Sequence, residues 1–373
     1  MIKNFDYLRE LKLIRSKIEK KFKIVLNSGN LILGSEVEKF EKNFSKFLGV
    51  KYGIGVGNCT DALFIALKAL DIGYDDEVIT VSNTAIPTIT AIVNSGARPR
   101  FVDVGEDYLI DCSKIVEQIN KKTKAILPVH LYGNTCDMKK IIIIAKKYNL
   151  KIIEDCAQST GSIYKNKKTG TFGDIGCFSF YPTKILGGFG DGGFISTNNK
   201  YLYEKMKRIR YMGIEVKKNL KSNLYNAVEH GTNSRLDELQ AGLLNIRLKK
   251  LDYYIKIRLK NARLYSHYLK NTDLILPNIY TNNQNVYYEY VVKHKNRKKI
   301  LDSLSKKKIF LKVTYPIPIH KMKPYKKWYN PSKDELKITE KNSNQIFSLP
   351  VYPGIKKNEI KKICKNLKSI LRK

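Results

Sequence analysis

Short apolar segments with strand character alternate with helical segments between about residues 50 and 250, and this alternation limits the possible folds most strongly. The strand-like segments cover residues 52–56, 77–81, 98–104, 125–133, 150–156, 175–180 and 192–198. Residues 61–72, 89–96 and 138–149 carry the helical patterns between them. Strands and helices that alternate at this spacing form a mostly parallel sheet with helices on both faces. The sequence therefore predicts an α/β fold.

The chain changes character after this region. Residues 236–269 carry apolar side chains three and four positions apart, which predicts one long helix that links two lobes. Beyond it, residues 285–294 alternate like a strand, residues 300–309 and 359–371 have helical patterns, and residues 310–319 are extended. We therefore predict a large domain over residues 1–250 and a smaller α+β domain over residues 251–373.

No apolar run in the 373 residues approaches the roughly 18 that a membrane span needs, so no membrane partner is expected. The first residues are charged and lack the apolar stretch of a signal peptide, which favours a cytoplasmic protein. The six cysteines stand singly, without a CxxC pair or a histidine at metal-binding spacing. We therefore expect reduced thiols and no metal site.

The net charge of +35 arises from 69 Lys and Arg against 34 Asp and Glu. Such a field attracts phosphates and nucleic acids. The basic residues are mostly Lys in short clusters along the chain, and no recognisable DNA- or RNA-binding module accompanies them. We therefore expect no nucleic-acid partner and interpret the charge as solvated helix faces that also attract an anionic substrate. A cofactor-binding regulatory or nucleic-acid-associated protein is the rival hypothesis.

The segment GNCTDAL at residues 57–63 forms a turn between a strand and a helix. A helix N-terminus offers unpaired N–H groups and the positive end of a dipole, which suits a phosphate. A simple helix cap at Thr60 is the alternative. A second segment, residues 151–158, is an apolar strand that ends in Asp155. A buried carboxylate there needs a cationic partner, such as a protonated pyridine nitrogen, unless it only caps the next helix.

A third segment, residues 177–193, runs from a strand to Lys184 and then into a glycine-rich turn. A lysine that is held partly out of water at such a turn can act as a nucleophile. A solvent-facing lysine is the common alternative in a chain so rich in Lys. The flanking strand and glycine-rich turn therefore indicate a reactive lysine, and the lysine alone does not.

The ordered set GNCTDAL, IIEDCAQ, FSFYPTK and NSRLDELQAGLL resembles the DegT-type sugar aminotransferases. These are fold type I, aspartate-aminotransferase-like enzymes that use pyridoxal 5′-phosphate (PLP). The similarity runs from residues 28–52 to the FSLPVYPG segment at residues 347–354. It implies that Lys184 forms a Schiff base with PLP and shuttles protons, that Asp155 pairs with the pyridine nitrogen, and that Gln158 hydrogen-bonds the ring hydroxyl.

The resemblance also implies a phosphate site that is shared between two subunits. The implied phosphate contacts are Cys59, Thr60, Ser179 and, from the neighbouring subunit, Asn233. The active sites are therefore expected at a homodimer interface. Many relatives have Gly at the position of Cys59 and an aromatic ring over the cofactor at the position of Ala85, so a smaller group must cover that face here.

The FYPTK segment followed by GDGG resembles family members that aminate carbon 3 of dTDP-linked 3-keto-6-deoxyhexoses, with glutamate as the amino donor. Amination of carbon 4 of a UDP-, GDP- or dTDP-4-keto-6-deoxyhexose is the alternative. Tyr181 and His320 are implied to contact the nucleotide-linked keto sugar, although His320 also fits a structural hydrogen-bonding role. Dehydrating relatives carry His where this chain has Lys184, so the lysine favours amino transfer in deoxyamino-sugar biosynthesis, for example of lipopolysaccharide.

Overall fold

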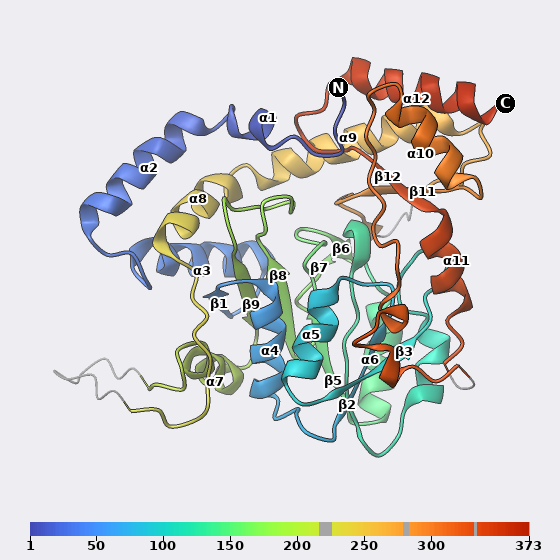
Figure 1. The fold of residues 1–373 in the computed structure, drawn as a ribbon. Coiled ribbons are helices and arrows are strands. Elements are labelled where there is room, and N and C mark those ends of the chain that lie inside the picture. Colours follow the sequence, from blue (N-terminus) through green and yellow to red (C-terminus); the bar gives the residue numbers. More distant parts are fainter. Residues whose placement is uncertain (216–225, 279–282, 332–333, 373) are drawn as a thin grey trace.

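The computed structural model describes residues 1–215, 226–278, 283–331 and 334–372 of the chain. Its centre is a seven-stranded sheet in the order β1-β9-β8-β5-β4-β2-β3 (Figure 1). The strands are β1 (Tyr52–Val56), β2 (Glu77–Val81), β3 (Arg98–Val102), β4 (Thr123–Ile126), β5 (Lys151–Asp155), β8 (Ile175–Ser179) and β9 (Gly193–Thr197). From β8 to β3 all neighbours are parallel, which confirms the predicted mostly parallel sheet. β9 is antiparallel to both β1 and β8.

Helices cover both faces of this sheet. Those of the first 210 residues are α1 (Tyr7–Leu11), α2 (Arg15–Ser28), α3 (Ser35–Leu48), α4 (Cys59–Ala69), α5 (Ile86–Asn94), α6 (Met138–Lys147) and α7 (Lys200–Arg210). On β8 and β9, Phe178 and Phe194 pack against Phe44 of α3. Cys177 and Ile195, the neighbouring residues on the same strands, point to the other face and belong to the core cluster that contains α4. On that face α4 lies beside α5 (Figure 1). Every residue of β8 and β9 is buried, so both faces of these strands carry apolar side chains.

The predicted long helix over residues 236–269 is in fact two helices, α8 (Glu238–Leu248) and α9 (Leu251–Leu269). Lys250 separates them with φ −111° and ψ 6°, outside the helical region. Leu244 and Leu251, on either side of the break, pack in the same core cluster. The apolar spacing therefore continues through the break and conceals it. α9 still leads from the sheet to the C-terminal part, as expected (Figure 1).

The C-terminal part combines a small sheet with helices. Its elements are β11 (Tyr290–Lys293), β12 (Ile346–Leu349), α10 (Arg297–Ser305), α11 (Lys337–Gln345) and α12 (Lys357–Leu371), and β10 (Asn283–Gln284) joins β6 (Ile163–Tyr164) and β7 (Lys167–Lys168). The strand predicted over residues 285–294 is present only in its second half. The N-terminus lies here too, since Ile2 pairs with Ile309 and Arg9 forms an ion pair with Glu359 at 2.7 Å (Figure 1). The domain boundary at residue 250 stays a prediction.

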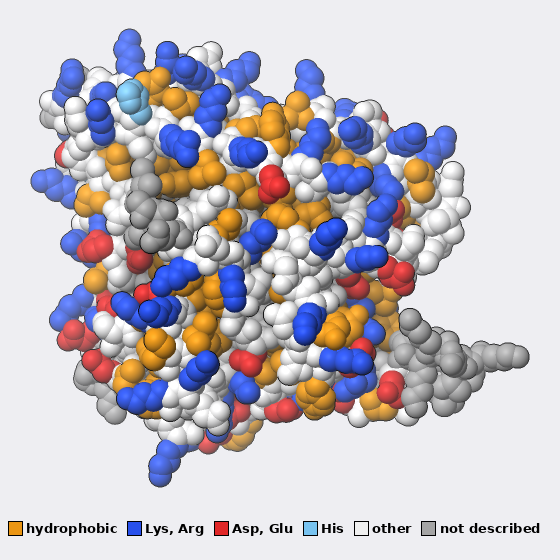
Figure 2. Space-filling view, turned by 180° about the vertical axis from the view of Figure 1, so that it is seen from behind, with side chains coloured by type: hydrophobic (Ala, Val, Ile, Leu, Met, Phe, Trp, Pro, Cys, Tyr) orange, Lys and Arg blue, Asp and Glu red, His pale blue; other side chains and the backbone are white. Residues whose placement is uncertain are grey.

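Lys and Arg side chains are spread over the face shown in Figure 2, among hydrophobic and acidic ones, and do not form one continuous patch. Some of them are neutralised locally, as where Lys122 Nζ lies 2.6 Å from Asp75 Oδ2. Within the described ranges, none of the helices has the length and apolar character that crossing a membrane requires.

Candidate active site

The three chemistry-bearing segments meet at one edge of the central sheet. β1, β5 and β8 end at this edge and β9 begins there, because β9 runs antiparallel to its neighbours. Val56 pairs with Gly193, and Gly193 pairs on its other side with Ser179. Asp155 pairs with Cys177, two residues before Ser179. The register therefore places the start of α4 beside Ser179 and Asp155.

The first turn of α4 offers backbone N–H groups at this edge. Asn58 caps the helix, because its side chain accepts a hydrogen bond from the Asp61 N–H at 2.9 Å. The N–H groups of Cys59 and Thr60 have no acceptor in the described part of the protein. Gly193 lets the turn lie against β9, since a Cβ there would be 2.4 Å from the Asn58 carbonyl oxygen. Free N–H groups at a helix N-terminus form a site for a phosphate.

Asp155 is a buried carboxylate. Its oxygens accept hydrogen bonds from the Thr88 hydroxyl at 2.8 Å and from the Ala157 N–H at 3.0 Å, which fix its orientation. Burial raises the pKa of Asp155, whereas these hydrogen bonds and the nearby Lys184 ammonium oppose the rise. Because an ionised carboxylate is costly to bury, this position favours a ligand that brings a positive charge.

Lys184 lies half-buried in the loop after β8. A turn holds it, in which the Lys184 N–H donates to the Tyr181 carbonyl at 2.8 Å and the Tyr181 N–H donates to Ser179 Oγ at 3.3 Å. Its Nζ is 4.7 Å from the centroid of the Tyr288 ring. The Tyr288 hydroxyl is in turn 3.1 Å from the Thr183 hydroxyl. A tyrosine from the C-terminal part therefore positions the amine, and the sequence patterns did not single it out.

Cys59 links these groups electrostatically. Its thiol is buried at the first position of α4. Burial raises the pKa of Cys59, the negative charge of Asp155 raises it further, and the Lys184 ammonium lowers it. The thiol therefore senses both the carboxylate and the amine, in agreement with the strand register, which brings these segments to the same edge of the sheet.

Gln158 is held between two tyrosines. Its Oε1 accepts a hydrogen bond from the Tyr132 N–H at 2.8 Å, and its Nε2 donates one to the Tyr315 hydroxyl at 2.9 Å. Burial raises the pKa of Tyr315, so this hydroxyl stays protonated. An amide nitrogen has two N–H donors, so Gln158 retains one for a ligand. The sequence patterns did not single out Tyr315, which lies 157 residues from Gln158 along the chain.

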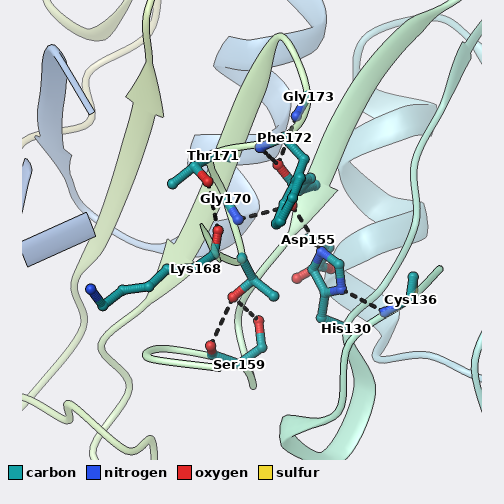
Figure 3. A network of polar contacts seen from close by, with 12 residues as sticks. His130, Cys136, Asp155, Ser159, Lys168, Gly170, Thr171, Phe172 and Gly173 are labelled. Atoms are coloured by element: carbon teal, nitrogen blue, oxygen red, sulfur yellow. Dashed lines mark hydrogen bonds and ion pairs between the residues drawn. The ribbon is translucent and has the colours of Figure 1, made fainter. Parts of the chain in front are cut away.

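A buried network holds the end of β5 from the opposite side of the strand. Glu154 precedes Asp155, so the two side chains leave the sheet on opposite faces. The Glu154 carboxylate accepts a hydrogen bond from His130 Nε2 at 3.0 Å (Figure 3). It also accepts hydrogen bonds of 2.7 to 2.9 Å from the backbone N–H groups of Gly170, Phe172 and Gly173. This network anchors the loop over residues 170–173 to the strand that carries Asp155.

His130, Glu154 and Cys156 lie close enough together to surround a metal ion. His130 Nδ1, however, accepts a hydrogen bond from the Cys136 N–H at 3.0 Å, which places the ring proton on Nε2 (Figure 3). Glu154 uses both oxygens for hydrogen bonds within the protein. The cluster is therefore an internally satisfied structural network and carries no argument for a metal.

Two of the residues expected at the site, Asn233 and Tyr181, are exposed, and Ala85 is partly exposed. Asn233 is exposed in the segment before α8, where its backbone pairs with Tyr211, and this exposure leaves it available to another subunit. Tyr181 is 53% exposed at the mouth of the Lys184 loop. Ala85 precedes α5 and lies one turn before Thr88, the donor to Asp155. A small side chain is therefore present where many relatives have a ring.

His320 is fully engaged within the protein. Its side chain is buried, with Nδ1 2.7 Å from Ser82 Oγ and Nε2 3.0 Å from Glu340 Oε1. Its ring packs at 4.5 Å against Tyr329. No ring nitrogen is left for a sugar, so the structure does not support the expected substrate contact. The sequence pattern could not show this, because Ser82 and Glu340 are distant along the chain.

The site fits a phosphate-bearing pyridine cofactor such as PLP. The unpaired N–H groups at the start of α4 suit its phosphate, and the buried carboxylate of Asp155 suits a protonated ring nitrogen. Lys184 supplies an amine at the same edge of the sheet.

Comparisons with known proteins agree with this geometry. Residues 12–368 match the model of the DegT/DnrJ/EryC1/StrS aminotransferase family. A dTDP-3-amino-3,6-dideoxy-alpha-D-galactopyranose transaminase of Aneurinibacillus thermoaerophilus is 42% identical over 94% of both chains. A dTDP-3-amino-3,4,6-trideoxy-alpha-D-glucose transaminase of Micromonospora megalomicea subsp. nigra is 41% identical over 94% of both chains. The crystal structure of S. venezuelae DesV in complex with a ketimine intermediate matches 100% of this chain and 99% of DesV, with a TM-score of 0.94 and 32% identity. The chain therefore belongs to the DegT/DnrJ/EryC1/StrS aminotransferase family.

Proposed function

We propose that this protein transfers an amino group from glutamate to carbon 3 of a dTDP-linked 3-keto-6-deoxyhexose. The observation that carries the proposal is that Asp155, the start of α4 and the loop that carries Lys184 meet at one edge of the central sheet. The two dTDP-3-amino-sugar transaminases that share 41% and 42% identity with this chain support the choice of sugar.

Enzymes of this family bind PLP, which accepts the amino group from one substrate and passes it to the other. In the proposed site, Asp155 keeps the pyridine nitrogen protonated, and Thr88 and Ala157 hold the carboxylate in place for this task. The free N–H of Gln158 Nε2 binds the ring hydroxyl, while Tyr132 and Tyr315 prevent the amide from turning. The phosphate is bound by Cys59, Thr60 and Ser179 at the edge of the sheet.

Lys184 carries out the proton transfers. In the first half of the reaction its Nζ would take the proton from the α-carbon of glutamate and pass it to the bound cofactor. In the second half it would take a proton back from the cofactor and deliver it to the sugar carbon that receives the amino group. The Tyr288 ring, whose centroid is 4.7 Å from Nζ, holds the amine in place between these steps, because a cation is attracted to the face of an aromatic ring.

We further propose that the site is completed in a homodimer. Asn233 is exposed on its own subunit and reaches the phosphate of the neighbouring one. Tyr181, which is also exposed, contacts the sugar nucleotide as it enters. Mixed dimers of Lys184→Ala and Asn233→Ala chains should regain turnover that neither variant shows alone. A strictly monomeric active enzyme would contradict the shared site.

The substrate is tested by supplying glutamate with each of three acceptors, namely a dTDP-3-keto-6-deoxyhexose, a dTDP-4-keto-6-deoxyhexose and a UDP-linked 3-keto sugar. Formation of amino sugar is followed by mass. We expect the highest kcat/KM with the dTDP-linked 3-keto sugar. A preference for the 4-keto sugar or for UDP would contradict the assigned position or nucleotide, and would leave amino transfer itself intact.

A further inference from the structure

A small cavity lies beside the Lys184 loop, on the side of the C-terminal part. Its volume is about 170 Å³. Thr183 and Tyr288 form one wall, and Tyr288 is also the residue whose ring contacts Lys184 Nζ. The cavity and the reactive amine therefore share a side chain.

Arg258 of α9 lines this cavity and is only 3% exposed. Its Nη1 donates to the carbonyls of Tyr287 and Tyr288, each at 3.2 Å, while its Nε has no partner in the described part of the chain. Burial lowers the pKa of Arg258, whereas the negative charges of Glu10 and, more weakly, Glu289 oppose this lowering. Neither carboxylate is hydrogen-bonded to Arg258, since Glu10 is bonded to Arg247 at 2.8 Å. A buried guanidinium that lacks a bonded carboxylate is a costly arrangement that an anion relieves.

The other charges of the cavity do not supply that anion. Glu289 is 5% exposed, and its carboxylate accepts hydrogen bonds from Lys312 Nζ at 3.0 Å, Thr314 Oγ1 at 3.1 Å and Ser348 Oγ at 2.5 Å. Lys312 therefore balances Glu289, and the charge of Arg258 remains in excess. The Lys312 ammonium has further N–H donors beyond the one that it gives to Glu289.

We propose that this cavity is a subsite for a carboxylate of the amino donor, bound by Arg258 and Lys312. The inference rests on the proposed amino transfer. A cavity of 170 Å³ is well below the 300 to 1,000 Å³ of pockets that enclose larger organic ligands, so it admits a carboxylate arm and excludes a sugar nucleotide. The shared Tyr288 wall places the rest of the donor toward Lys184. A planar guanidinium is also well suited to a carboxylate, which it can bind through two parallel hydrogen bonds.

The test uses glutarate, a dicarboxylate without an amino group, in calorimetric titrations of the PLP-loaded enzyme. Arg258→Lys and Lys312→Gln should each weaken glutarate binding about tenfold or more, because a charge-assisted hydrogen bond is lost. They should raise the KM for glutamate similarly and leave the KM for the sugar nucleotide unchanged. Arg263→Lys, at an exposed position of the same helix, is the matched control and should bind glutarate like the wild type.

Wild-type glutarate affinity in both variants would overturn the proposal, and so would a selective loss of sugar-nucleotide binding. If Arg258→Lys does not fold, Lys312→Gln decides alone. If the wild type binds glutarate through these two residues but glutamate gives no turnover, then the donor assignment in the proposed function fails while the carboxylate subsite stands.

Discussion

Replacing Asp155 with Asn distinguishes two effects of this carboxylate. In the cofactor-bound enzyme the carboxylate supports turnover, whereas in the cofactor-free protein its buried charge lowers the free energy of unfolding. Asn has nearly the same shape and can keep both hydrogen bonds. Its Oδ1 still accepts from the Ala157 N–H, and its Nδ2 can donate to the Thr88 hydroxyl, which now acts as acceptor. The substitution therefore removes a buried negative charge and little else.

In the cofactor-free protein, Asp155→Asn should raise the free energy of unfolding by roughly 1 kcal/mol at neutral pH, because a buried charge is replaced by a neutral group. The pH dependence follows the same reasoning. Burial raises the pKa of Asp155 above its usual 3.8, so the folded state binds this proton more tightly than the unfolded state does. The contribution of Asp155 to stability therefore falls as pH rises above 3.8, and the variant should lack this fall.

In the PLP-bound enzyme the same substitution should be unfavourable and should lower turnover, because it removes the partner of the protonated pyridine nitrogen. Breaking a buried ion pair costs about 3 to 5 kcal/mol. At about 1.4 kcal/mol per factor of ten, this corresponds to a loss of roughly 10² to 4 × 10³ in turnover. Urea unfolding without PLP and steady-state amino-sugar formation with PLP measure the two effects. Wild-type turnover in the variant, or a cofactor-free variant that is less stable than the wild type, would refute this account of Asp155.

Three further predictions concern other residues of the site. Lys184→Ala should abolish turnover while leaving the thermal unfolding midpoint within a few degrees, and measurable amino-sugar formation would count against its catalytic role. Glu154→Gln should lower the free energy of unfolding in urea by about 2 to 5 kcal/mol. The reason is that an amide nitrogen would face the His130 and backbone donors that now meet a carboxylate oxygen. An unchanged urea midpoint would disprove this. Burial lowers the pKa of His320 below 6.5, so the stability that this residue contributes should be lost as pH falls below about 6.5, and His320→Gln should flatten that dependence without changing the KM for the sugar nucleotide.

The parts of the fold that depend on local patterns could be predicted from the sequence. The strands of the central sheet and the helices between them follow from alternating apolar runs, because a sheet buried on both faces needs continuous hydrophobic strands. The antiparallel direction of β9 could not be predicted, since one strand of a buried sheet has the same pattern in either direction. The break at Lys250 was missed because the apolar spacing continues across it.

In the candidate site, too, some residues could be predicted from local sequence patterns and others could not. Asp155 is the last residue of β5, while Lys184 and the start of α4 follow β8 and β1, so the topology brings them to the same edge of the sheet. Tyr288 and Arg258 come from a different part of the chain and have no local motif, so only the packing of α9 and the C-terminal part reveals them. The sequence left two roles open for His320, a substrate contact and a structural hydrogen bond. It could not decide between them, because the partners Ser82 and Glu340 become neighbours of His320 only in the folded chain.

The most direct test of the central claim is an absorption spectrum of the PLP-supplied protein, recorded before and after the addition of glutamate. The account predicts a visible band from PLP bound covalently to a lysine, which glutamate converts to a band in the near ultraviolet. Lys184→Ala should lack the first band. A wild-type protein that shows no visible band when PLP is supplied, or whose spectrum glutamate leaves unchanged, would contradict the claim that Lys184 holds PLP for amino transfer from glutamate.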